Sequence, residues 1–256
     1  MLNLYALFLG ALIASSSYGD IIDGVPDSDG RFLNVAKLEL GAPGANDSET
    51  YVCTGTVLSD RTVLTAGHCL YDLRNDPANS ILKINGADHK AKAIHFPDGF
   101  LEGQRSYLAL NAQLNAAPFG SLKYIKLGKK AQDSFLENAE RDLALIITKE
   151  VISFTVPRTE LRFKKLKDNS PVVAAGYGYT QFELGAPYGG YSGQTDIPFY
   201  RNELSSESPN STYAIQNPNA KYGITSPGDS GSPLLTLKGD AYEQVGVLSG
   251  RYTPRP

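Results

Sequence analysis

Several residue types are scarce in this chain of 256 residues, which has no tryptophan, two cysteines and three histidines. No set of the cysteine and histidine residues has the spacing of a metal site. The sequence also lacks internal repeats, a low-complexity tail and a glycine-rich phosphate loop between a strand and a helix. We therefore predict no metal, no nucleotide and no other cofactor.

An excess of positive charge is missing as well. The chain has 24 lysine and arginine residues against 27 aspartate and glutamate residues, a formal net charge of -3. Proteins that bind nucleic acids or anionic membranes usually carry a positive surface. We predict no nucleic-acid partner and no membrane partner once the N-terminal segment has been removed, and we expect a monomer.

Long apolar runs are absent after the N-terminus. The run from Leu4 to Ile13 is almost continuously apolar, and small residues follow from Ala14 to Ser17. This pattern is typical of a secretory signal, although no lysine or arginine precedes the run. The run is also too short to span a bilayer. We predict that residues 1–19 are a signal peptide and that the protein is secreted or periplasmic.

Short segments rich in β-branched and apolar residues predict an all-β fold. The chain has 25 glycines and 15 prolines, which supply turns between these segments. Helical composition is limited to Leu101–Ala117 and Lys129–Glu140, where Ala, Leu, Gln and Glu dominate. We expect strands within residues 31–40, 54–65, 80–84, 143–148, 172–175, 234–237 and 244–248.

Three separate segments carry the residues of a nucleophilic site. Ser230 lies in the glycine-flanked turn Ser226–Pro233, directly before an apolar run. His68 ends the sequence Val-Leu-Thr-Ala-Gly-His, and Asp142 precedes Leu-Ala-Leu-Ile. An imidazole exchanges protons near neutral pH, so it can take the proton of an attacking serine hydroxyl and return it to a leaving amine. Taken singly, each residue has an ordinary structural role, and His89 and His95, which lack such flanks, are predicted surface residues.

Together these segments resemble the T-A-A-H-C, D-[IL]-A-L and G-D-S-G-G-P blocks of the chymotrypsin/trypsin-type serine endopeptidases. The chain order His, Asp, Ser is that of this family and differs from the orders in α/β-hydrolases and subtilisins. The resemblance implies that His68, Asp142 and Ser230 form a catalytic triad. It also implies an oxyanion hole made by the backbone N–H groups of Gly228 and Ser230.

The resemblance further implies an all-β fold of two packed six-stranded antiparallel barrels with Greek-key connections. The protease domain would cover residues 20–256, with a first barrel over about 21–150 and a second over about 155–256. In the family the chain continues after the segment that matches Gly246–Gly250 through another strand and a helix. Only six residues follow Gly250 here. We therefore expect the second barrel to be incomplete, unless the sequence itself is incomplete.

Two pairs of residues match structural features of the family. Cys53 and Cys69 correspond to the disulfide beside the catalytic histidine, and a cysteine pair in an exported protein is usually bridged. Ile21 and Asp229 correspond to the activation pair, in which a freed N-terminal ammonium contacts the carboxylate before the nucleophile. The match is imperfect there, because Asp23 replaces a glycine and no lysine or arginine precedes Ile21.

Four residues correspond to the family's substrate pocket, namely Ile224, Thr225, Ser249 and Gly250. Ile224 takes the position at the base of the primary pocket. An apolar side chain there cannot pair with a lysine or arginine of the substrate, so we expect a preference for apolar or small side chains. Ser249 is also expected to support the catalytic aspartate.

The hypothesis is therefore a secreted serine endopeptidase that hydrolyses peptide bonds of a protein or peptide substrate through an acyl-enzyme intermediate. The alternative is a non-catalytic binding protein, or an inactive truncated product, on the same scaffold. An esterase or a peptidase with one dedicated target is a third possibility.

Overall fold

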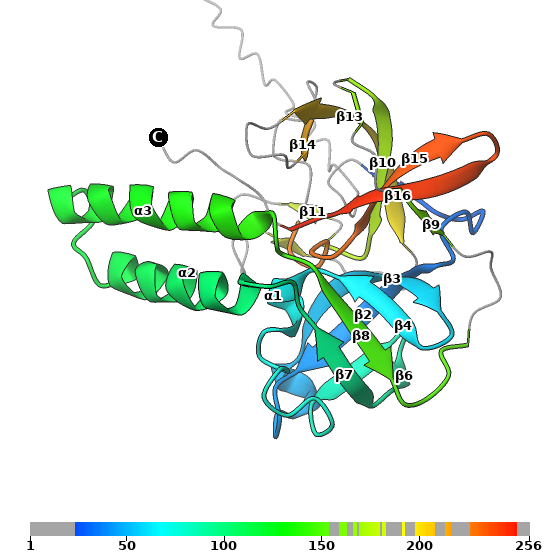
Figure 1. The fold of residues 1–256 in the computed structure, drawn as a ribbon, viewed down its shortest axis with the longest axis horizontal. Coiled ribbons are helices and arrows are strands. Elements are labelled where there is room, and N and C mark those ends of the chain that lie inside the picture. The colour runs from blue at the N-terminus through cyan, green and yellow to red at the C-terminus, as the bar shows by residue number, and fades with distance from the viewer. Residues whose placement is uncertain are drawn as a thin grey trace, which may run out of the picture.

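The computed structural model describes residues 24–153, 159–162, 166–167, 169–179, 181–182, 191–192, 198–207, 213–216 and 226–249. The predicted signal peptide and Ile21, Ile224, Thr225 and Gly250 lie outside these ranges. The described chain forms two curled, mainly antiparallel β-sheets and a helical hairpin (Figure 1). Among its described helices, none has both the length and the apolar character needed to cross a membrane.

The first sheet has seven antiparallel strands in the order β6-β5-β2-β3-β4-β8-β7. Strand alternation explains its core, because Ala36, Leu38 and Leu40 of β2 are fully buried while Lys37 and Glu39 are half-buried. The strands are β2 (Val35–Gly41), β3 (Tyr51–Ser59), β4 (Thr62–Thr65), β5 (Ile81–Ile84), β6 (Ala87–Asp88), β7 (Ala91–His95) and β8 (Ala144–Thr148).

The second sheet has the order β1-β13-β10-β15-β16-β9, and β14 also pairs with β13. Its strands are β1 (Val25–Pro26), β9 (Glu160–Leu161), β10 (Pro171–Gly176), β13 (Phe199–Glu207), β14 (Tyr213–Gln216), β15 (Pro233–Lys238) and β16 (Ala241–Val247). The strand β9 lies at one end of this order and pairs with β16 in parallel. The short strands β11 (Gln181–Phe182) and β12 (Tyr191–Ser192) form a separate pair.

Helices are few. A 3-10 turn, η1 (Asp47–Glu49), precedes β3, and α1 (Gly67–Leu70) follows β4. The hairpin α2 (Phe100–Asn115) and α3 (Leu122–Ala139) is inserted between β7 and β8 and projects away from both sheets (Figure 1). Both helices were predicted, but α3 begins seven residues before Lys129. The hydroxyl of Ser121 caps it by accepting the N–H of Tyr124 at 3.1 Å, and an N-cap of this kind starts a helix.

The two sheets meet through an apolar cluster. The start of β2 supplies Val35 and the preceding Phe32, which pack against Val173 and Ala175 of β10 and Leu235 of β15. This contact brings the turn before β15 against β3 and β4 of the first sheet. The all-β class is confirmed, with seven strands in each sheet where six were expected. The domain boundaries at about residues 21–150 and 155–256 remain a prediction.

Candidate active site

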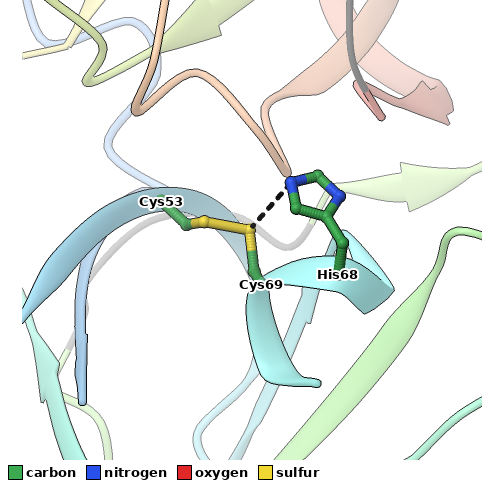
Figure 2. Close-up of side chains that lie close together, drawn as sticks. All are labelled: Cys53, His68 and Cys69. Carbon is green, nitrogen blue, oxygen red and sulfur yellow. Dashed lines mark hydrogen bonds between the residues drawn. A yellow bond between two sulfur atoms is a disulfide. The ribbon is translucent and has the colours of Figure 1, made fainter. Parts of the chain in front are cut away.

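His68 lies on the single turn of α1, which starts directly after β4 ends. A disulfide between Cys53 of β3 and Cys69 of α1 fixes this turn to the sheet, with 6.4 Å between the two Cα atoms (Figure 2). The hydroxyl of Tyr51 donates to the carbonyl of Cys69 at 2.7 Å, and burial raises the pKa of this phenol well above its usual value. The segment that carries His68 is therefore held in place from two sides.

His68 makes two contacts with Asp142. Its ring atom Nδ1 lies 2.7 Å from Oδ2 of Asp142, and its backbone N–H donates to Oδ1 at 2.7 Å. Asp142 is 5% exposed, whereas the His68 side chain is 30% exposed. An ionised carboxylate can only accept hydrogen bonds, so Nδ1 of His68 carries the proton in this contact. In the neutral ring Nε2 is then the acceptor nitrogen.

Ser249 supplies a further hydrogen bond to the same carboxylate. Its hydroxyl donates to Oδ2 of Asp142 at 2.5 Å. Ser249 follows β16, so the second sheet contributes directly to the His68–Asp142 pair. A buried carboxylate needs such donors, because they replace the water that burial removes.

Ser230 lies in the turn before β15, and two glycines shape that turn. Gly228 has φ +102°, a backbone conformation that side chains rarely allow. Gly231 approaches the first sheet so closely that a Cβ atom there would lie 2.0 Å from the carbonyl oxygen of Thr54. The turn is also anchored to the end of β16, since the N–H of Gly231 donates to the carbonyl of Leu248 at 2.8 Å.

The backbone N–H groups of Gly228 and Ser230 donate to no protein acceptor within the part of the chain that the structure describes. Both neighbours of Ser230, by contrast, use their N–H groups: Asp229 donates to Ser226 at 3.1 Å and Gly231 to Leu248. An uncommitted N–H on Ser230 itself, together with a second one two residues earlier on Gly228, is the arrangement that an oxyanion site requires.

Ser230 and His68 both lie close to the sulfur atom of Cys69. Sγ of Cys69 lies 3.9 Å from Nε2 of His68 and 3.7 Å from the carbonyl oxygen of Ser230. In Figure 2 Nε2 of the imidazole faces Sγ of Cys69, and an orange turn of the chain passes beside the ring. No hydrogen bond joins the Ser230 hydroxyl to the imidazole among the described residues.

Comparison with known proteins identifies the fold. A family model described as "Trypsin-like peptidase domain" matches residues 53–242, which are most of the chain and run from within β3 to within β16. The chain belongs to the trypsin-like peptidase family. Membership supports a protease-like hydrolase function with proteins as substrates, and it confirms the family resemblance that the three sequence segments carry.

Two individual proteins are similar to this trypsin-like peptidase chain. A mutant of human heparin binding protein (CAP37) superimposes with a TM-score of 0.52 at 15% sequence identity, over 90% of this chain and 85% of that one. "Extracellular metalloprotease" of Bacillus subtilis (strain 168) is 33% identical over 72 residues, which are 28% of this chain and 22% of that protein. The chain thus matches about a fifth of the bacterial protein's length. The human protein's likeness concerns the fold alone.

Thr54 of the peptidase domain is a site residue that the sequence did not indicate. It is fully buried on β3, and its backbone N–H donates to the carbonyl of Ser230 at 2.8 Å. Its hydroxyl donates to the carbonyl of Gly228 at 2.8 Å and accepts the N–H of Tyr177 at 3.0 Å. Thr54 therefore connects the first sheet to the turn before β15 at two points, the carbonyl groups of Gly228 and Ser230.

Asp229 is fully buried beneath the same turn. Its carboxylate accepts the N–H of Gly178 at 2.9 Å, the N–H of Ser226 at 2.8 Å and the Ser226 hydroxyl at 3.0 Å. The carboxylate is thus hydrogen-bonded within the second half of the molecule. Its predicted contact with Ile21 involves a residue outside the described part and stays a prediction.

The bacterial relative's name raises the question of a metal. Among the described residues, the one group of His, Cys, Asp and Glu ligand atoms close enough for an ion is Cys53, His68 and Cys69. Both of its sulfur atoms belong to the disulfide and cannot serve as thiolate ligands. This donor set does not fit a metal ion.

His89 differs from its predicted surface position. It is 8% exposed, and its backbone N–H donates to the carbonyl of Leu82 on β5 at 2.8 Å. His95 is exposed, as predicted. Both residues lie outside the sequence motif that contains His68, and neither is part of the candidate site.

Proposed function

We propose that this protein is a serine endopeptidase in which Ser230 is the nucleophile, His68 the general base and Asp142 the residue that orients the base. The observation that carries the proposal is the buried contact between Asp142 and Nδ1 of His68, next to a disulfide that also touches Ser230. This contact directs the acceptor nitrogen Nε2 away from the carboxylate. We further propose that the protein is exported after loss of residues 1–19.

The reaction that these residues support has two stages. The Ser230 hydroxyl oxygen attacks the carbonyl carbon of the peptide bond while Nε2 of His68 takes the hydroxyl proton. The N–H groups of Gly228 and Ser230 stabilise the negative oxygen of the tetrahedral intermediate. When the carbon–nitrogen bond breaks, His68 returns the proton to the leaving amine and an ester on Ser230 remains. Water then attacks the ester by the same sequence of proton transfers.

The preference for apolar or small side chains rests on Ile224 and remains part of the proposal, as do Thr225 and Gly250 as pocket residues. Ser249 contacts Asp142 directly, which supports a role in holding the aspartate. A modest rotation of the His68 side chain toward Ser230 is required in the working enzyme, since apo sites often hold longer contacts than complexes with substrate.

One observation favours a second function, a non-catalytic binding protein on this scaffold. No hydrogen bond joins Ser230 to His68 in the described chain, and Nε2 lies toward Cys69 instead. The completeness of the proposed triad argues for the enzyme, because loss of catalysis in such folds usually accompanies loss of one of these residues.

The test is hydrolysis of an unfolded protein substrate, followed by mass spectrometry of the products. Replacing Ser230 or His68 by alanine is expected to lower kcat by at least about a thousandfold. Ser106→Ala and His95→Ala are matched controls, because both residues are exposed and lie outside the site. A folded wild-type protein without peptidase activity would support the binding function, and activity on esters alone would indicate an esterase.

A further inference from the structure

The hairpin of α2 and α3 carries large apolar side chains that are mostly exposed. Its far end, residues 116–130, is called the hairpin tip below. Within it Phe119 is 89% exposed, Leu122 68% and Ile125 61%. Exposed apolar residues scattered over a surface need no explanation, but three neighbouring ones at the end of a projecting element indicate an interaction site (Figure 1).

The packing of the two helices does not use these side chains. Leu114 and Ala131 are buried between the helices, the rings of Tyr107 and Phe135 lie 5.6 Å apart, and Asn138 donates to Gln104 at 2.9 Å. The three exposed residues lie on the opposite face of α3 and on the connecting loop. Phe119 is held there by the ring of Tyr124, with 5.1 Å between ring centroids. The hairpin is thus complete without them.

The charge of the same region is opposite to that of the whole chain. Between Glu102 and Asp133 the sequence has no acidic residue. It has five basic residues there, and all of them are exposed: Arg105, Lys123, Lys126, Lys129 and Lys130. Lys129 pairs with Asp133, one helical turn farther along α3, at 3.2 Å. Lys123 and Lys126 lie in the same two turns of α3 as Leu122 and Ile125, so positive charge accompanies the exposed apolar residues.

We propose that the hairpin tip binds the surface of an anionic lipid bilayer. Phe119, Leu122 and Ile125 enter the boundary between head groups and acyl chains, while the lysines contact the lipid phosphates and carboxylates. Apolar residues flanked by lysine are the pattern of an interfacial membrane anchor. The proposal is independent of catalysis, and it departs from the prediction of no membrane partner, which rested on a net charge averaged over the chain.

Lipid fits the hairpin tip better than other anionic partners do. A nucleic acid or a sulfated polysaccharide would bind the lysines but would leave Phe119, Leu122 and Ile125 in water. A protein partner needs a complementary surface of considerable area, whereas the tip is convex and narrow (Figure 1). A fluid bilayer can surround separate side chains on a convex tip.

The test is co-sedimentation of the full chain with vesicles, one set of phosphatidylcholine alone and one with phosphatidylglycerol added. We expect binding to the anionic vesicles at low salt and loss of binding at high salt. Each lysine near the bilayer contributes about fivefold to the partition coefficient, so Lys123→Gln with Lys126→Gln is expected to weaken binding by about twenty-five-fold. Phe119→Ser is expected to weaken it by about tenfold.

Matched controls come from the rest of the molecule. Lys92 is an exposed lysine on β7, and Lys149 is an exposed lysine directly after β8. Leu237 on β15 of the second sheet is 63% exposed. Lys92→Gln with Lys149→Gln, and Leu237→Ser, should bind vesicles as the wild type does. Circular dichroism checks that every variant is folded.

Three results would overturn the proposal: no binding to anionic vesicles, equal loss of binding in the control variants, or Phe119→Ser binding as tightly as the wild type. Tighter retention on a heparin-like polysaccharide than on vesicles, insensitive to Phe119→Ser, would also overturn it. Each outcome is independent of peptidase activity, so it leaves the proposed function untouched.

Discussion

Thr54 is the residue through which the first sheet holds the turn that carries Ser230. Its backbone and side chain together form hydrogen bonds with Ser230, Gly228 and Tyr177. The bond to the Gly228 carbonyl fixes the peptide that follows Gly228 and, through it, the path of the turn between the two proposed oxyanion donors. A hydroxyl at this position therefore has a geometric consequence at the site.

We predict that Thr54→Val lowers kcat by about tenfold or more with little change in KM, provided that the proposed peptidase function holds. The variant removes the hydrogen bonds that the Thr54 hydroxyl makes with the Gly228 carbonyl and the Tyr177 N–H, and the loss of each buried bond costs about 1 kcal/mol of stability or more. Thr54→Ser keeps the hydroxyl and should restore kcat. Steady-state kinetics and urea unfolding test both variants, and equal kcat values for the valine and serine variants would contradict the role.

Gly231 offers a second test at the residue scale. Its φ is +89°, and a Cβ atom would collide with the Thr54 carbonyl. We predict that Gly231→Ala reduces the free energy of unfolding by at least about 3 kcal/mol. Gly239→Ala is the matched control, because Gly239 has φ +62° but no atom within 4 Å of the added Cβ. It should cost only about 1 kcal/mol. Similar losses for the two variants would show that backbone conformation alone, and not the contact with Thr54, matters.

Sequence reasoning proposed His68, Asp142 and Ser230 as a triad because each lies in a short segment with characteristic neighbours. It missed Thr54, because the contacts of this residue join positions 174 apart in the chain and leave no local pattern. His89 was assigned to the surface for a related reason: its burial depends on strand pairing in the first sheet. Local motifs predict which residues react, whereas long-range packing decides which residues hold them.

At the scale of elements, α1 shows how a very short helix can be stable. It has a single turn, and an isolated helix of this length does not form in water. The disulfide to β3, the Tyr51 hydroxyl and Phe100 hold it instead. A Cβ atom added at Gly67 would lie 2.6 Å from the Phe100 ring, so the ring packs directly on the start of α1.

We predict that replacing both Cys53 and Cys69 by alanine lowers the free energy of unfolding by about 3 kcal/mol, because the bridge closes a loop with a sequence separation of 16. Chemical denaturation of the oxidised and reduced wild-type protein should give a similar difference. An unchanged midpoint after reduction would show that the bridge does not limit stability.

Strands and helices were predicted most accurately where the residues of the element alone show its periodic pattern. The strands β2, β5, β8, β10 and β15 lie close to their predicted positions. The start of α3 was predicted too late, because Tyr124 and Ile125 are weaker helix formers than alanine or leucine and the cap at Ser121 determines the start. The short strand β9 was not predicted, since two residues carry no periodicity.

On the scale of the whole molecule, an ionic network closes the edge of the second sheet. Lys238 contacts Glu243 at 2.6 Å and Glu160 at 3.3 Å, and Arg162 contacts Glu243 at 3.1 Å. The network joins β9 to β15 and β16. The hydrogen bond from Lys238, and then that from Arg162, lower the pKa of Glu243 below its usual value.

This shift makes stability depend on pH. A carboxyl group whose pKa is lower in the folded state stabilises the fold above its unfolded pKa of about 4.3, and this contribution disappears as the pH falls through the folded pKa. We predict that Glu243→Gln is less stable than the wild type at neutral pH and that the difference shrinks in acid. Urea unfolding at several pH values measures it. A difference that stays constant down to acid pH would contradict the role of the charge.

The central claim is that distant segments of both sheets meet to activate one serine. Intact-mass spectrometry after treatment with a fluorophosphonate tests it most directly, because this reagent forms a bond only with an activated hydroxyl. We predict a single adduct on the wild-type chain, located at Ser230 by peptide mapping, and none on folded Ser230→Ala or His68→Ala. A folded wild-type protein that remains unlabelled, or that is labelled at another residue, would contradict the account.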